Sequence, residues 1–180
     1  MPALLDDVVA LTQRLVAIDS VNPGLVPGAA GEAAIAEFTA DLLADAGFEV
    51  RLLPADEDPS RLSVVAVHNG PHPGRTVVFN GHLDTVGVEN MDDPFGARID
   101  SGRMLGRGTC DMKGGLAGLM VAASQLVRER VPGRVVLALV ADEEDLSLGT
   151  PPVLAHLGEQ GIKADACIVA EPTWLDLAVA

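Results

Sequence analysis

Six residues of this chain have side chains suited to metal binding and acid–base chemistry. They are one histidine and five carboxylates: His82, Asp84, Asp111, Glu143, Glu144 and Glu171. Neutral imidazole and carboxylate oxygens are both good zinc ligands, and a carboxylate can bridge two ions held about 3.5–4 Å apart. This mixture of residue types suits a pair of divalent metal ions.

The spacing of these residues supports the same interpretation. His82 and Asp84 are alternate residues of GHLDTV, and alternate residues of a strand point the same way. Asp84 is therefore placed to accept a hydrogen bond from the ring nitrogen of His82 that does not bind metal, which would fix the tautomer. The neighbours Glu143 and Glu144 allow one carboxylate to ligate while the other stays free as a base. Each motif is weak alone, and the hypothesis depends on their joint occurrence.

Apolar patterns predict the elements that position these residues. Helical spacing is found at residues 4–18, 32–46, 112–130 and 151–160. Strands are expected at FEVRLL, LSVVAV, TVVFNG, RVVLALVADEE, ACIVAEP and LDLAVA, with a hairpin around Ser101–Gly102. The sequence thus predicts an α/β fold of three αβα layers with a mostly parallel or mixed central sheet. Ligand sites of such sheets lie outside the carboxyl ends of the strands, where most of the candidate residues fall.

Composition and charge exclude several classes of protein. The 180 residues include 26 acidic and 12 basic ones, for a net charge of −14, which disfavours binding to nucleic acid or to an anionic membrane. No apolar run reaches the roughly eighteen residues of a membrane span, and the N-terminus lacks a signal-peptide pattern. The two cysteines form no disulfide framework, and both Cys110 and Cys167 are expected to be buried thiols. These features predict a cytoplasmic protein.

The polar segments also resemble a known family. GHLDTV, GRGTCDMKGG, ADEED and AEPT, in this order, are similar to the motifs of the aminoacylase, acetylornithine deacetylase, succinyl-diaminopimelate desuccinylase and glutamate carboxypeptidase family of dinuclear metallohydrolases. The loop IDSVNP and the tripeptide DPF match the same family. The resemblance implies a zinc-exopeptidase-like fold and hydrolysis of an amide bond in an N-acyl amino acid or small peptide.

The resemblance also implies a set of metal ligands. His82 and Glu171 would ligate the first metal, Asp111 would bridge both, and Glu144 would ligate the second. The two divalent ions are expected to be zinc, with cobalt or manganese as alternatives.

The resemblance assigns the remaining roles to two carboxylates. Asp84 would orient His82, and Glu143 would act as the general base and later as the proton donor to the leaving amine. The metals would acidify a bound water and polarise the carbonyl.

The length of the chain sets a further expectation. Family members continue after the EPT segment with a lid domain through which they form homodimers, and a late histidine then completes the second metal site. Residues 1–180 are therefore expected to be the N-terminal part of the catalytic domain, with the lid domain and the C-terminal catalytic segment missing. The second metal would then have only Asp111, Glu144 and water, and would bind more weakly.

Two hypotheses compete with hydrolysis. The first is a truncated, non-catalytic fragment of such an enzyme that still binds metal. The second is a nucleotide-binding α/β protein, which is disfavoured because no G-x-G-x-x-G follows a first strand and no G-x-x-x-x-G-K-[ST] occurs.

Overall fold

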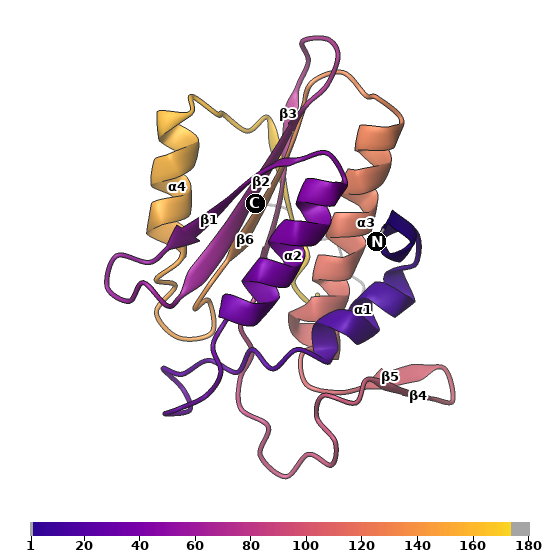
Figure 1. The fold of residues 1–180 in the computed structure, drawn as a ribbon, viewed down its shortest axis with the longest axis vertical. Helices are drawn as coiled ribbons and strands as arrows, with labels where there is room; N and C mark the ends of the chain where they lie inside the picture. The colour runs from indigo at the N-terminus through magenta and orange to yellow at the C-terminus, as the bar shows by residue number, and fades with distance from the viewer. Residues whose placement is uncertain (1, 174–180) are drawn as a thin grey trace.

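A five-stranded mixed sheet forms the centre of the structure, a computed structural model that describes residues 2–173 (Figure 1). The strand order is β1-β2-β6-β3-β7. The strands are β1 (Glu49–Pro54), β2 (Leu62–Asn69), β3 (Thr76–His82), β6 (Arg134–Val140) and β7 (Ala166–Val169). β1, β2 and β6 pair antiparallel, whereas β6, β3 and β7 pair parallel. The predicted mixed sheet is confirmed.

Helices cover both faces of this sheet (Figure 1). One layer holds α1 (Val8–Val16), α2 (Ala33–Asp45) and α3 (Gly114–Arg128). The opposite layer holds α4 (Thr150–Glu159). The predicted three-layer αβα architecture is therefore confirmed. Among the described residues, no helix is both long enough and apolar enough to cross a membrane.

The apolar run of β6 explains why both faces need cover. Leu137 and Leu139 are fully buried in the cluster beneath α1, α2 and α3. Their neighbours Val136 and Ala138 point the other way and pack with Val153 of α4. Successive residues of a strand alternate between faces, so a continuous apolar run is what a strand buried on both sides requires.

Two predicted helices begin later than expected. The segment predicted as one helix over 4–18 is a 3₁₀ turn (Pro2–Asp6) followed by α1, because the side chain of Asp7 accepts hydrogen bonds from the N–H groups of Val9 and Ala10 and caps a new helix. The helix predicted over 112–130 begins at Gly114 as α3, after an irregular turn over Thr109–Lys113.

The predicted hairpin is present as β4 (Arg98–Asp100) and β5 (Arg103–Leu105). Its turn residues Ser101 and Gly102 have φ values of 50° and 78°, the left-handed backbone that tight hairpins favour. The strand expected at LDLAVA lies outside the described residues.

Both predictions for the cysteines were wrong, because Cys110 and Cys167 are exposed. Cys167 lies in β7, which pairs with β3 on one side only among the described residues and whose four residues are all exposed. Cys110 lies in the turn that leads into α3. The burial of a strand residue depends on its neighbouring elements, which the alternation of the strand itself does not reveal.

Candidate metal centre

The candidate residues lie at one edge of the sheet. β3, β6 and β7 are parallel, so their carboxyl ends are adjacent. His82 is the last residue of β3, Glu143 and Glu144 follow β6, and Glu171 follows β7. Asp111 reaches the same edge from the turn before α3. Four segments that are distant in the sequence thus deliver one imidazole and several carboxylates to one place.

His82 lies at the centre of this cluster. Its Nε2 is 2.9 Å from Oδ1 of Asp111 and 3.8 Å from Oε1 of Glu171. Two sets of three residues bring their potential ligand atoms within 4.8 Å of one another: His82 with Glu143 and Glu171, and His82 with Asp111 and Glu144. The imidazole is buried, whereas the side chains of Asp111 and Glu171 are partly exposed.

Asp84 lies beneath His82 and contacts it in two ways. Its backbone carbonyl oxygen is 2.9 Å from Nδ1 of His82, and its carboxylate Oδ1 is 3.6 Å from the same atom. The carboxylate accepts hydrogen bonds from the backbone N–H groups of Glu143 at 3.0 Å and Glu144 at 3.1 Å. Asp84 therefore contacts both the histidine and the segment that carries the two glutamates.

The orientation of His82 shows that this cluster suits a cation. A carbonyl oxygen only accepts hydrogen bonds, so the Nδ1–H group of His82 donates a hydrogen bond to the backbone carbonyl oxygen of Asp84. In the neutral ring, the lone pair of Nε2 then points toward carboxylate oxygens of Asp111 and Glu171, which also only accept. That arrangement is stable when a proton or a metal ion lies between them. One imidazole with several carboxylates is also a ligand set that zinc takes, so the residues present fit a divalent ion.

The pKa values reflect the same excess of negative charge. Burial lowers the pKa of His82, but hydrogen bonds with Asp84 and Asp111 and the charge of Glu171 outweigh it and raise that pKa to about 10. Burial raises the pKa values of Glu144 and Glu171, and the neighbouring carboxylate of Asp111 raises them further. The pKa of Asp84 is lowered, because hydrogen bonds from His82 and Asn22 outweigh the opposing effect of burial. A cation bound here would favour the ionised form of the carboxylates and the neutral form of His82, because a nearby positive charge stabilises anions and disfavours a second cation.

A buried polar network that the sequence patterns do not reveal lies beneath the cluster. Arg61 is only 3% exposed and donates two hydrogen bonds to the carboxylate of Glu32, at 2.7 and 2.5 Å. It also lies 2.8 Å from Oδ1 of Asp142, which in turn accepts a bond from Asn22. No local sequence pattern identifies this group of four residues, because their partners are distant in the sequence. They are Asn22, Glu32, Arg61 and Asp142.

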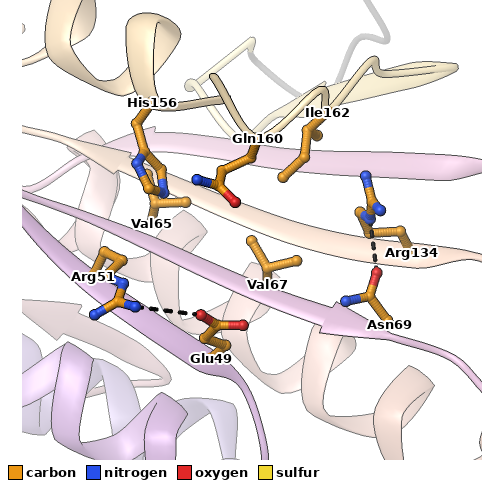
Figure 2. A pocket seen from close by; sticks show the side chains of 9 residues that line it. All are labelled: Glu49, Arg51, Val65, Val67, Asn69, Arg134, His156, Gln160 and Ile162. Atoms are coloured by element: carbon orange, nitrogen blue, oxygen red, sulfur yellow. Dashed lines mark hydrogen bonds and ion pairs between the residues drawn. The ribbon is translucent and has the colours of Figure 1, made fainter. Parts of the chain in front are cut away.

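A separate hollow lies between α4 and the sheet, away from these residues (Figure 2). Its volume is about 130 Å³, and none of the six candidates lines it. Four of its polar side chains form two pairs: Arg51 with Glu49, and Arg134 with Asn69 at 2.8 Å. The cluster at the strand ends is therefore the better candidate site.

The fold and the grouped side chains together define an α/β protein with a candidate metal site at the carboxyl edge of its sheet. The chain belongs to peptidase family M20/M25/M40, whose model matches residues 78–180. This result confirms the family predicted from the motifs.

Curated relatives are similar along nearly the whole chain. A succinyl-diaminopimelate desuccinylase of Roseobacter denitrificans is 42% identical over 182 residues, which cover 98% of this chain and 45% of that protein. The succinyl-diaminopimelate desuccinylase of Zymomonas mobilis is 35% identical over 172 residues, covering 93% of this chain and 43% of the relative. The chain therefore spans less than half the length of these relatives.

Solved structures share the fold. Human carnosine dipeptidase 1 superposes with a TM-score of 0.77 at 20% identity, over 93% of this chain and 39% of that one. An M20 family metallo-carboxypeptidase from Sulfolobus solfataricus gives a TM-score of 0.74 at 20% identity, over 92% of this chain and 37% of that one. At this level of identity the likeness supports the fold of the catalytic domain.

Proposed function

We propose that this protein hydrolyses an amide bond in an N-acyl amino acid or small peptide with the help of divalent metal ions. The observation that carries the proposal is the position of His82, whose Nε2 faces carboxylates of Asp111 and Glu171 at the carboxyl edge of the sheet. The desuccinylase relatives support an N-succinyl amino acid as the first substrate class to test.

Four residues would hold the ions. His82 and Glu171 would ligate the first, Asp111 would bridge, and Glu144 would ligate the second. Zinc is the first candidate, with cobalt or manganese as alternatives. Bound at these residues, the ions would supply an acidified water and would polarise the scissile carbonyl.

Glu143 would act as the general base. Its side chain is exposed, whereas that of Glu144 is half-buried, so Glu143 is the more accessible of the two to water and substrate. Its carboxylate would take a proton from the attacking water and pass it to the leaving amine. The backbone N–H of Glu143 donates to Asp84, which limits the movement of its main chain while the side chain stays free.

The domain organisation completes the proposal. Residues 1–180 would form the N-terminal part of a catalytic domain, consistent with the share of about 45% that they cover in the Roseobacter relative. Homodimerisation through a lid domain and a cytoplasmic location stay predictions.

The test is an assay of the full-length protein with zinc or cobalt on N-succinyl and N-acetyl amino acids, measured as release of the free amine. We expect Glu143→Gln to lower kcat by about 10²–10⁴-fold, the usual contribution of a general base, while metal binding is retained. Glu129→Gln, at an exposed glutamate after α3, is the matched control and should keep full activity. Unchanged turnover in Glu143→Gln would overturn the assignment of the base. Metal binding without hydrolysis of any of these substrates would contradict the proposed activity.

A further inference from the structure

The side chain of Asn22 is fully buried between two carboxylates. Its Nδ2 is 2.7 Å from Oδ2 of Asp84 and 3.0 Å from Oδ1 of Asp142. Its Oδ1 accepts a hydrogen bond from the backbone N–H of Gly24 at 2.8 Å. Because carboxylates only accept and an N–H only donates, these partners fix the orientation of the amide. The side-chain NH₂ group of Asn22 thus donates one hydrogen bond to each of two buried carboxylates.

Asp142 organises the loop that follows β6. Its Oδ2 accepts hydrogen bonds from the backbone N–H groups of Leu146 at 3.3 Å and Leu148 at 3.2 Å. Its own backbone carbonyl accepts from Ser147 at 2.5 Å. Asp142 is itself completely buried and lies 2.8 Å from the guanidinium of Arg61. The loop over residues 142–149 is therefore folded around this carboxylate.

Asp84 holds the other end of the same loop. Its carboxylate accepts the N–H groups of Glu143 and Glu144, and its carbonyl oxygen contacts Nδ1 of His82. The side-chain amide of Asn22 consequently links Asp84, which contacts His82, to Asp142, around which the loop over residues 142–149 folds. The two carboxylates that Asn22 contacts, Asp84 and Asp142, belong to neither group of potential metal ligands.

We propose that Asn22 is a positioning residue of the metal centre, which sets the place of Glu143 and Glu144 relative to His82 through Asp84 and Asp142. The proposal rests on the function proposed above. Removing the amide leaves two buried carboxylates each short of one hydrogen-bond donor, which is costly in a buried polar network. Without this link, Asp84 and the loop over residues 142–149 can move apart. The carboxylates of Glu143 and Glu144 are then no longer held in place relative to His82.

The test compares the full-length protein with its Asn22→Ala variant. We expect a 10–100-fold loss of affinity for Zn²⁺, the usual effect of losing a residue that supports a ligand. The absorption spectrum of the Co²⁺-loaded protein should change, since it reports ligand geometry. Exchange of the amide protons of Glu143 and Glu144 should become faster. Leu43→Ala, at a fully buried position of α2, is the control: it should lower Tm yet leave the affinity and the spectrum unchanged.

A folded Asn22→Ala protein with unchanged affinity, spectrum and exchange would overturn the proposal. Asn22→Asp keeps the shape but replaces the donors by acceptors, so its loss of affinity should exceed that of Asn22→Ala. If neither variant folds, the unmodified protein still decides the question by NMR. The side-chain NH₂ protons of Asn22 should resist exchange with solvent, and exchange at the rate of exposed amides would contradict the proposed bonds.

These readouts also separate the inference from the proposed function. Failure of the unmodified protein to bind Zn²⁺ or Co²⁺ would defeat the proposed function. Amide exchange at Glu143 and Glu144 would still show whether Asn22 holds the loop.

Discussion

The centre of the sheet and several polar residues at its carboxyl edge are both buried, but different interactions stabilise them. At the centre, Leu137 and Leu139 are fully buried among other apolar side chains, and their stabilisation follows the apolar area removed from water. At the edge, His82, Asp84 and Asp142 are equally buried but depend on directed hydrogen bonds. A change at the centre should therefore affect stability, and a change at the edge should affect ligand geometry.

The largest expected effect tests the first half of that comparison. Leu137→Ala should lower the free energy of unfolding by about 2–5 kcal/mol, the usual cost of truncating a fully buried leucine. Zn²⁺ affinity of the folded fraction should stay unchanged, because Leu137 lies in the apolar cluster beneath α1, α2 and α3. Urea unfolding and a chelator-competition titration measure the two quantities. A parallel loss of metal affinity would show that the core and the edge are not independent.

The second prediction tests the edge. His82→Ala should weaken binding of the first Zn²⁺ by more than about 100-fold, because loss of a direct ligand should exceed the 10–100-fold cost of losing a supporting residue. His156→Ala, on α4 beside the separate hollow, is the matched control and should bind as the unmodified protein does. Retention of tight binding in His82→Ala would remove the first site from the proposal.

The third prediction uses the raised pKa of His82. With a pKa of about 10, the ring stays protonated from pH 6 to pH 8, so binding of a metal ion at Nε2 must displace one proton throughout this range. Apparent Zn²⁺ affinity should therefore rise about tenfold per pH unit. With an ordinary histidine pKa of about 6.5, the rise would level off above pH 7. Competition titrations at pH 6, 7 and 8 distinguish the two curves.

Local sequence patterns predicted the centre of the molecule well. The apolar run of β6 and the helical spacing of α2 placed those elements to within a few residues, because the faces they bury set their periodicity. The six candidate residues were found from their types and motifs, and the structure brings them to one edge. Their individual roles stay predictions.

The supporting contacts of the edge were beyond reach from the sequence. Asn22 and Asp142 are 120 positions apart, and nothing near either residue indicates the other. The sequence around Arg61 resembles a loop and does not indicate that this arginine is buried against Glu32. The exposure of Cys167 likewise depends on which strands neighbour β7. These features arise from tertiary pairing, which local periodicity does not encode.

The position of β7 has a consequence for occupancy of the site. β7 is only four residues long and all four are exposed, and a segment with few buried contacts opens at a lower free energy than the core. Glu171 lies two residues after this strand, so its place beside His82 depends on the strand being closed. The apparent dissociation constant equals the intrinsic one divided by the fraction of molecules whose strand is closed. Anything that keeps β7 closed would therefore tighten metal binding without touching a single ligand.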